Sequence, residues 1–259
     1  MFAEGRKQVK AVIPASGDGT RMAALLKEKP KELAEINGRP LIQYAIDECL
    51  RSGIKEIIVI VSVKKTELIR YLEEITSDYE DKNVFIDIVY QNEKNGSGGA
   101  IIAARKNIDK DDFCVLFPDV FLHENESNLE RMIKVFDKCN APVILVDEIR
   151  EDELDRYGIT VAEKMTDGYY DIEYMLEKPL KVPKARFYHG IIGRYVLPNS
   201  FIDKLGDLKM NIKNEIDLSE ALIESGKKTA VLMNGKHYEC GSVSSYTESV
   251  ECLRKVEAL

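Results

Sequence analysis

Residues 11–22 have the sequence AVIPASGDGTRM, and residues 29–44, a short distance further on, have the sequence KPKELAEINGRPLIQY. An apolar run over residues 9–15 ends in a glycine-rich turn, which is typical of a buried strand. The turn, residues 16–21, combines small residues with one cation, Arg21. Glycines let backbone N–H groups converge on phosphate oxygens, and a guanidinium adds a planar fork of donors, so this turn indicates a phosphate-binding loop. A flexible turn with a solvated arginine explains the same residues equally well.

Two other phosphate-binding patterns do not fit the chain. The dinucleotide fingerprint G-x-G-x-x-G requires a glycine where Met22 stands, and an acid at the end of the second strand, where the chain has Val61 and Ser62. The pattern GxxxxGK[ST] does not occur. A nicotinamide-dependent dehydrogenase is therefore disfavoured.

Strand and helix patterns alternate along the first two-thirds of the chain. The expected strands cover residues 9–15, 56–62, 84–90, 113–117 and 143–146, and the helices between them cover residues 41–50, 67–75, 97–106 and 129–139. This alternation predicts an α/β fold with a mostly parallel sheet, whose ligands bind beyond the carboxyl ends of the strands. We expect the loops at residues 15–22, 91–99 and 118–120 to lie there.

The pattern changes after about residue 150. Longer strands at residues 158–162, 169–176 and 190–197 predict a small antiparallel extension over the site. Helices at about 199–205 and 215–225, a hairpin through Asn234-Gly235 and a terminal helix near 243–256 are expected after them. Because neither a repeat nor a linker is visible, we predict a single domain over residues 1–259.

The composition narrows the function classes. The 259 residues are 44% hydrophobic and 32% charged with a net charge of −8, which argues against a nucleic-acid partner. Neither an apolar signal region nor a run of eighteen apolar residues is present, so we expect a cytoplasmic protein without a membrane contact. The five cysteines are scattered without a CxxC pair and are expected to be reduced thiols.

The stretch AVIPASGDGTRM, followed by KPKELAEINGRPLIQYAIDECLRSGIKEIIVI, resembles the signature of the sugar-1-phosphate nucleotidyltransferases. Within that family it is most similar to the bacterial and archaeal UTP–glucose-1-phosphate uridylyltransferases, and the similarity continues at intervals to about residue 247. The resemblance implies a Rossmann-like three-layer α/β/α fold of the nucleotide-diphospho-sugar transferase type and a homo-oligomer. It also implies the joining of UTP and glucose-1-phosphate to UDP-glucose and pyrophosphate, with Mg²⁺.

The implied reaction is attack by a sugar phosphate oxygen on the α-phosphorus of a nucleoside triphosphate. That oxygen is already anionic, so the enzyme has to align two polyanions and offset their repulsion rather than supply a nucleophile. Cations, backbone amides and Mg²⁺ perform this task.

The resemblance assigns a role to each residue that matches the family motifs. The implied catalytic cations are Arg21, Lys31 and Lys178, and the implied sugar-binding residues are Gly158 and Glu177. The implied nucleotide-binding residues are Ala15, Gly17, Gly19, Thr20, Gln91 and Gly98, and the implied metal ligands are Asp119 and Glu239. Without the motifs, Lys31 would be a surface lysine, Asp119 a turn-former and residues 177–179 an exposed strand end.

The chain departs from the family pattern at three places. It has Pro118-Asp119-Val120 where GDD or GDN is usual, and Tyr238-Glu239-Cys240 where YDC is usual. It also has GSGGA at residues 96–100 in place of GLGHA. Thymidylyl or guanylyl transfer to another sugar phosphate therefore stays open, as does a non-catalytic nucleotide-sugar-binding subunit. Of the histidines, His123 and His237 are expected on the solvated surface, and His189 has no assigned role.

Overall fold

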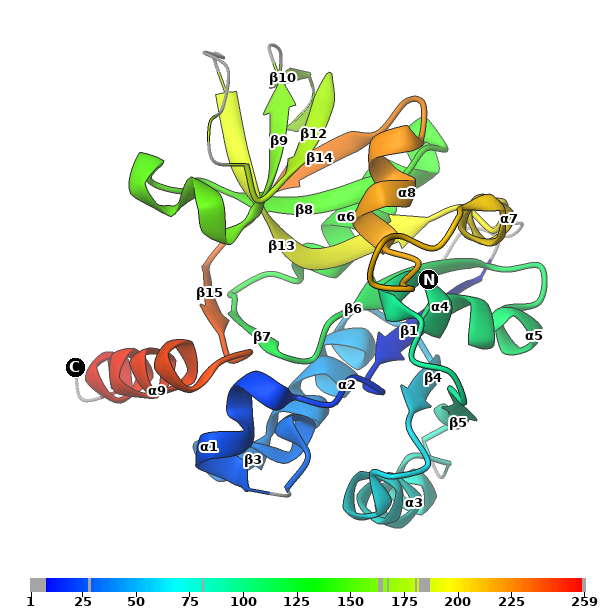
Figure 1. Ribbon diagram of the computed structural model, residues 1–259, viewed down its shortest axis with the longest axis vertical. Helices are drawn as coiled ribbons and strands as arrows, with labels where there is room; N and C mark the ends of the chain where they lie inside the picture. The colour runs from blue at the N-terminus through cyan, green and yellow to red at the C-terminus, as the bar shows by residue number, and fades with distance from the viewer. Residues whose placement is uncertain are drawn as a thin grey trace.

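A computed structural model of the protein describes residues 8–27, 29–80, 82–162, 165–166, 168–179, 181 and 187–257. Its main sheet holds two sets of parallel strands joined by one antiparallel strand (Figure 1). The first set, in spatial order, is β6 (Asp112–Leu116), β1 (Val9–Pro14), β4 (Glu56–Val61) and β5 (Phe85–Tyr90). The second set is β8 (Val143–Asp147) and β14 (Thr229–Leu232), and β13 (Phe187–Leu197) lies between β6 and β8. The expected mixed, mostly parallel sheet is confirmed.

Helices cover both faces of this sheet because its strands are apolar on both sides. In β4, Ile57, Val59 and Val61 belong to one buried cluster, whereas Ile58 and Ile60 belong to another. The first cluster is covered by α2 (Leu41–Arg51), α3 (Thr66–Glu80) and α6 (Asn128–Cys139). The second is covered by α4 (Gly96–Ala103), α5 (Arg105–Ile108), α7 (Phe201–Asp207) and α8 (Leu218–Glu224). The fold is thus the expected three-layer arrangement.

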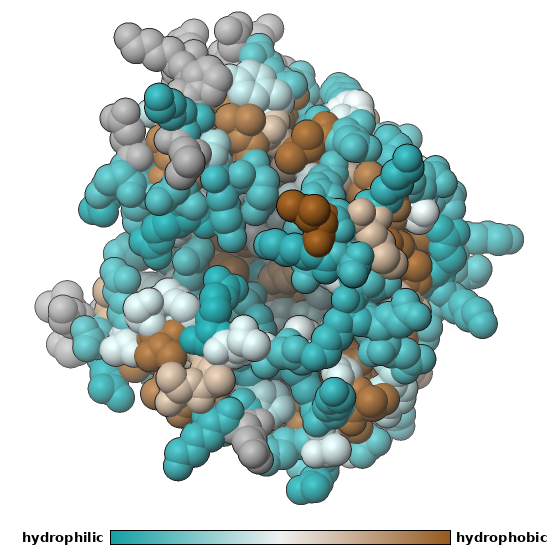
Figure 2. All heavy atoms as spheres, in the orientation of Figure 1, coloured by the Kyte–Doolittle hydropathy of each residue, from teal (hydrophilic) through white to brown (hydrophobic). Residues whose placement is uncertain are grey.

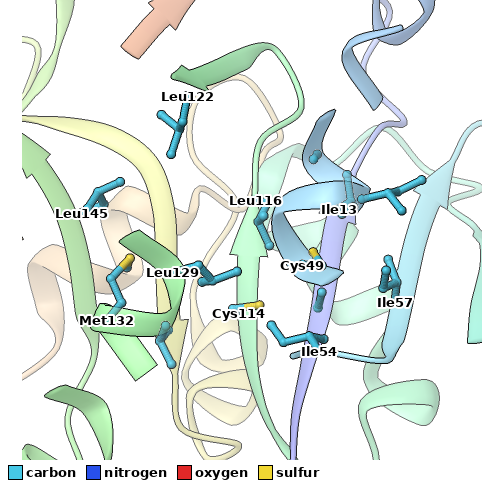
Figure 3. Packing of buried hydrophobic residues seen from close by; sticks show 14 of the residues in the cluster. Ile13, Cys49, Ile54, Ile57, Cys114, Leu116, Leu122, Leu129, Met132 and Leu145 are labelled. Atoms are coloured by element: carbon cyan, nitrogen blue, oxygen red, sulfur yellow. The ribbon is translucent and has the colours of Figure 1, made fainter. Parts of the chain in front are cut away.

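Three of the five cysteines, Cys49, Cys114 and Cys240, are buried, whereas Cys139 is half-buried and Cys252 is exposed. Cys49 of α2 and Cys114 of β6 lie in the same cluster, which Figure 3 shows from close by. Burial raises the pKa of both thiols, which keeps them protonated. All five cysteines are free.

The antiparallel extension is present, but its strands differ from the prediction. β9 (Gly158–Ala162) pairs with β13 and with β12 (Tyr174–Glu177), whereas β11 (Tyr169–Asp171) pairs with β10 (Met165–Thr166) and β14. The single strand expected over residues 169–176 is therefore wrong. The reason lies in two neighbouring amides, because Ile172 N donates to Lys228 O while Glu173 N donates to Val161 O. The chain changes partner between these residues without a break in its apolar pattern.

The hairpin expected at Asn234-Gly235 is also wrong. Gly235 does form a turn, with a φ of +106°, but the strands on either side of it do not pair. β14 already has β8 and β11 as neighbours, so β15 (Lys236–Glu239) pairs with β7 (Val120–His123), a strand that the sequence analysis missed. The expected terminal helix is α9 (Val243–Glu257).

The segment that follows the first glycine-rich turn lies beside this C-terminal part. It contains α1 (Ala23–Leu26), the short 3₁₀ turns Thr20–Met22 and Lys31–Leu33, and the strand pair β2 (Glu35–Ile36) and β3 (Arg39–Pro40). Met22, Ile36, Tyr238 and Leu253 meet in a third buried cluster, which joins it to β15 and α9. In the described part of the chain, no helix has the length and apolar character needed to cross a membrane.

Candidate active site

The three loops expected at the carboxyl ends of the parallel strands do come together. The Ser16 hydroxyl donates to Gln91 Oε1, which joins the loop after β1 to the loop after β5. A Cβ placed on Gly241 would lie 3.1 Å from Asp119 Oδ2 and 3.4 Å from Arg21 Nη2, so the turn after β6 lies beside the same loop. Figure 2 shows this face hollowed near its middle, between the part with β9 and β13 and the part with α1 and α9.

The loop after β1 leaves backbone groups open to a ligand. Nothing lies within 4 Å of the position that a Cβ on Gly17 would take. Gly19 has a φ of +66°, which favours glycine, and a Cβ there would lie 3.3 Å from Lys31 Cγ. Thr20 and Arg21 are exposed in the short turn that follows. The glycines therefore bring the loop close against the stem of Lys31.

Lys31 and Asp119 form the central ion pair of the site. Lys31 Nζ lies 2.7 Å from Asp119 Oδ2, and each side chain is 17% exposed. Burial by itself would lower the pKa of Lys31, but the carboxylates of Asp119 and Glu32 outweigh it and the pKa is raised. Burial would likewise raise the pKa of Asp119, but Lys31 and then Arg21 outweigh it and the pKa is lowered. Both groups are therefore charged at neutral pH.

A second ion pair, between Lys65 and Glu32, lies next to the first. Lys65 Nζ donates to Glu32 Oε2 at 2.7 Å and to the Ala15 carbonyl at 2.8 Å. Burial, together with the charge of Lys31, lowers the pKa of Lys65 even though Glu32 opposes the change. The Ala15 carbonyl is thus held by a lysine of the next βα loop, which the sequence analysis did not single out.

A cavity of about 380 Å³ opens between these two loops. It runs from Asp18 and Gly19 to the start of α3. Its cationic lining residues are Lys27, Lys29, Lys31, Lys64 and Lys65. Its lining also includes Asp18 and Glu67, so positive charges outnumber negative ones along its wall. An anionic group would be favoured there.

The two expected metal ligands differ in their surroundings. Within the described residues, no three or more His, Cys, Asp or Glu side chains converge so that they could hold a metal ion. Mg²⁺ is commonly bound through one or two carboxylates with water and substrate phosphates, so the largely buried Asp119 carboxylate beside Arg21 and Lys31 fits such a site. Glu239 Oε2 lies 3.5 Å from Arg156 Nη2, at a partly exposed position.

Gln91 lies in a network of its own at the end of β5. Its Nε2 donates to Asn95 Oδ1 at 2.6 Å, and its Oε1 accepts from Ser16. Asn95 Oδ1 lies where a Cβ on Gly99 would be, at 1.8 Å, so Asn95 takes up the space of a side chain at position 99. This explains in part why the loop departs from the GLGHA pattern.

Gly98 has a packing reason to be glycine. Its N–H donates to the Ile216 carbonyl at 2.8 Å, and a Cβ would lie 2.7 Å from Ile216 Cγ2. Ser97 does not cap its own helix; its hydroxyl instead accepts from Leu218 N at 3.0 Å at the start of α8. The nucleotide contact expected of Gly98 stays a prediction.

Gly158 and Glu177 face each other across β9 and β12, where they are partners in the strand register. A Cβ on Gly158 would lie 3.1 Å from Glu177 Oε2. The Glu177 residue is exposed, but neighbouring atoms partly desolvate its carboxylate. This desolvation raises the pKa of Glu177, although the charge of Lys178 opposes the rise. Lys178 is exposed and has a φ of +42° at the end of the strand. A carboxylate and a glycine backbone therefore lie side by side, and a cation follows the carboxylate in the chain, which suits hydroxyl groups and a phosphate.

The histidines were only partly predicted. His123 is exposed at the end of β7, but the surface position expected for His237 is wrong. The side chain of His237 is 14% exposed, with Nδ1 2.9 Å from Asp147 Oδ2 and Nε2 3.2 Å from the Tyr157 hydroxyl. His189 is 3% exposed and packs against Tyr170, with 4.9 Å between the centroids of the two rings.

A buried ion pair near Asp119 was not predicted from the sequence. Arg194, in the middle of the apolar strand β13, is 1% exposed, and its Nη2 lies 2.8 Å from Glu48 Oε2. A single arginine within the apolar run IIGRYVL is the signal that could have found it, because a fully buried charge requires a partner.

Comparisons with known proteins agree with this geometry. Residues 10–255 match the model of a family described as nucleotidyl transferase. The chain is 30% identical to the UTP–glucose-1-phosphate uridylyltransferase of Pseudomonas aeruginosa, over 93% of this chain and 94% of that protein. It is 31% identical to the enzyme of the same name from Haemophilus influenzae, over 93% of this chain and 91% of that protein.

Solved structures give the same result. The structure of a UDP-glucose pyrophosphorylase complexed with UDP-glucose superposes with a TM-score of 0.84 and 29% identity, covering 96% of this chain and 99% of that one. A UTP-bound enzyme of this kind from Acinetobacter baumannii gives a TM-score of 0.82 and 27% identity, covering 95% and 93% of the two chains.

Proposed function

The chain belongs to the nucleotidyl transferase family, and from this premise we propose that it joins UTP and glucose-1-phosphate to give UDP-glucose and pyrophosphate. The observation that carries the proposal is the meeting of Arg21, Lys31 and Asp119 beside the glycine-rich loop. The names of the relatives at 30% and 31% identity support the choice of substrates.

The cations of the site suit the transfer of a nucleotidyl group. Arg21 and Lys31 offer donors to the triphosphate on one side of the reacting phosphorus, and Lys178 is proposed to hold the phosphate of the sugar. Charge that develops on phosphate oxygens in the transition state is stabilised by donors that are already in place. The cationic cavity beside Gly19 would favour the outer phosphates and the pyrophosphate that leaves.

Asp119 is proposed to hold Mg²⁺, with Glu239 as a second carboxylate. When bound, Mg²⁺ would neutralise part of the phosphate charge and so reduce the repulsion between the substrates. Lys31 Nζ is 2.7 Å from Asp119, so this lysine would orient the carboxylate as well as contact phosphate. For Glu239 to take part, its carboxylate has to leave Arg156, which is 3.5 Å away.

The base is proposed to be read by Gln91. Its amide presents a donor and an acceptor together, which matches the edge of uracil. In this structure both groups are engaged, by Asn95 and Ser16, so the base would replace internal hydrogen bonds. Ala15, Gly17, Thr20 and Gly98 are proposed to line the nucleotide with backbone atoms.

The sugar is proposed to lie between Gly158 and Glu177. A glycine lets the ring approach the β9 backbone, and Glu177 accepts hydrogen bonds from hydroxyl groups. We further propose that one domain, residues 1–259, carries the whole site, that it acts in the cytoplasm and that it forms a homo-oligomer.

The test is pyrophosphate release from the purified protein with Mg²⁺. Five nucleoside triphosphates are combined with common sugar-1-phosphates, and UTP with glucose-1-phosphate is expected to give the highest kcat/KM. A higher value with dTTP or GTP would replace the proposed base. Tight binding of UDP-glucose without release from any pair would instead identify a non-catalytic binding subunit.

A further inference from the structure

Arg194 contacts the turn that carries Asp119 on both sides. Residues 117–120 form this turn, which is closed by the bond from Val120 N to Phe117 O at 3.3 Å. Arg194 Nη1 donates to Phe117 O at 2.9 Å, and Nη2 donates to Val120 O at 2.8 Å. One guanidinium thus bonds the carbonyl just before Pro118 and the carbonyl just after Asp119.

All five N–H groups of Arg194 are used. Nε and Nη2 donate to the two oxygens of Glu48 at 2.8–3.0 Å, and Nη1 also reaches the Gly193 carbonyl at 3.2 Å. Glu48 is 2% exposed on α2, so the pair ties a helix of one layer to the loop at the sheet edge. A planar fork can make these contacts together, whereas an ammonium cannot.

A bulge in β13 aims Arg194 at the turn. The five residues from Ile191 to Tyr195 oppose only three of β8, from Val146 to Ile144. Gly193 lies inside this bulge with a φ of +61°, and a Cβ there would contact Phe117 and Val120 at 3.5 Å. Bulges often redirect a side chain toward a functional site.

The burial of the Glu48–Arg194 ion pair is not explained by its contribution to stability. Burying two charges carries a desolvation penalty, and well-packed apolar residues of similar volume are often as stable or more so. Two of the N–H groups of Arg194 nevertheless donate to a single turn, and the Asp119 carbonyl of that turn also accepts a hydrogen bond from Cys240 N at 2.8 Å.

We propose that Arg194, held by Glu48, is a positioning residue that fixes the turn of residues 117–120 and so orients the Asp119 carboxylate toward metal and phosphate. The proposal rests on the function proposed above. Partners that orient a metal ligand change metal affinity or activity by roughly 10–100-fold when they are removed.

The test compares three variants with the wild-type protein. The double variant Glu48→Leu/Arg194→Met removes both charges and keeps a similar side-chain volume. Glu48→Gln removes the carboxylate charge but leaves Arg194 in place to donate to the turn. Lys228→Met is the control. Lys228 is a buried cation that also bonds carbonyls, those of Ser225 and Gly226, but it lies between α8 and β14. Arg194→Lys serves in place of the double variant if that protein does not fold.

Two measurements do not require catalysis. One is the amide hydrogen exchange of Val120 and Cys240 in the protein alone, and the other is the half-saturating concentration of Mn²⁺ with UTP, followed by electron paramagnetic resonance. We expect faster exchange at both amides and a roughly 10-fold or greater rise in half-saturation for the double variant. Glu48→Gln should give smaller changes, and Lys228→Met should give none.

Wild-type exchange and Mn²⁺ binding in the double variant would overturn the proposal, as would equal changes in Lys228→Met. Failure of the proposed function looks different, because the wild-type protein itself would then release no pyrophosphate. The exchange of Val120 and Cys240 would still decide whether Arg194 holds the turn.

Discussion

Lys31 Nζ and Asp119 Oδ2 lie 2.7 Å apart, although 88 residues of sequence separate them. The pair joins the loop after β1 to the turn after β6, which are the two places where phosphate and metal are proposed to bind. Because each partner is largely buried, each needs the other to remain charged in the absence of a ligand. A triphosphate would give Lys31 a second anion, and Mg²⁺ would give Asp119 a second cation, so substrate binding replaces a charge balance that already exists.

Removing the ammonium of Lys31 should lower kcat/KM. Lys31→Met keeps the aliphatic stem that packs against Gly19 but lacks the charge. We expect kcat/KM to fall by roughly 10²-fold or more, which is the usual effect of removing one charge-stabilising donor. Steady-state pyrophosphate release measures it. The control is Lys138→Ala on the exposed side of α6, and equal rates in the two variants would remove Lys31 from the site.

The ion pair should also give the stability a defined pH dependence. The pKa of Asp119 is lowered in the folded protein, so its contribution is present above its unfolded value, about 3.9, and is lost as the pH falls through the folded value. The pKa of Lys31 is raised, so its contribution is lost only as the pH rises through the folded value, above about 10.4.

Asp119→Asn should therefore lower the free energy of unfolding by about 1.5–3 kcal/mol at pH 7, the usual size for a hydrogen bond between charged groups. The difference from the wild-type protein should begin to shrink below about pH 4, near the unfolded pKa, and should vanish only below the lowered folded pKa of Asp119, where both proteins carry a neutral side chain at this position. Urea unfolding at several pH values measures it, with Asp78→Asn on the exposed side of α3 as the control. A difference in the free energy of unfolding that stays constant down to pH 3 would show that the stabilisation by Asp119 does not depend on its ionisation.

The sequence predicted the parallel half of the fold because its signals are local. The runs in β1, β4, β5 and β6 are bounded by turns, and their carboxyl ends must share one edge. Partner choice is not local, which is why β7 was missed and why Asn234-Gly235 was taken for a hairpin. Whether β15 pairs with β14 or β7 depends on the neighbours that β14 already has.

The same limit applies to the site. Motif order placed Arg21, Lys31 and Asp119 correctly near one another, since family signatures record residues that meet in space. The supporting residues belong to no such motif. Lys65 donates to the carbonyl of Ala15, and Arg194 donates to carbonyls of the turn at Asp119. Every residue type has a backbone carbonyl, so the sequence does not indicate which carbonyls accept these bonds. Only the unusual burial of these charges could have pointed to them.

The two proposed metal ligands should not be equal. The side chain of Asp119 is 17% exposed and lies beside Arg21 and Lys31, whereas that of Glu239 is 32% exposed and lies 3.5 Å from Arg156. We expect Asp119→Asn to raise the half-activating Mg²⁺ concentration more than Glu239→Gln does, because a less exposed carboxylate is less screened by water and attracts a cation more strongly. Titration of pyrophosphate release with Mg²⁺ measures both. The control is Arg156→Gln, and a larger effect in Glu239→Gln than in Asp119→Asn would reverse the assignment.

A methyl group on Gly158 should affect the sugar and not the nucleotide. In Gly158→Ala the new Cβ would lie 3.1 Å from both Glu177 Oε2 and Ile191 Cδ1, so Glu177 would have to shift by a few tenths of an ångström. The methyl would also project from the backbone that the sugar ring is proposed to approach. We expect KM for glucose-1-phosphate to rise by roughly 10-fold, with little change in KM for UTP, since binding of only one substrate is impaired. Gly226→Ala is the matched control, because nothing lies within 4 Å of its Cβ position. Equal increases in both KM values for Gly158→Ala would mean that the sugar lies elsewhere and that the substitution disturbs the whole site.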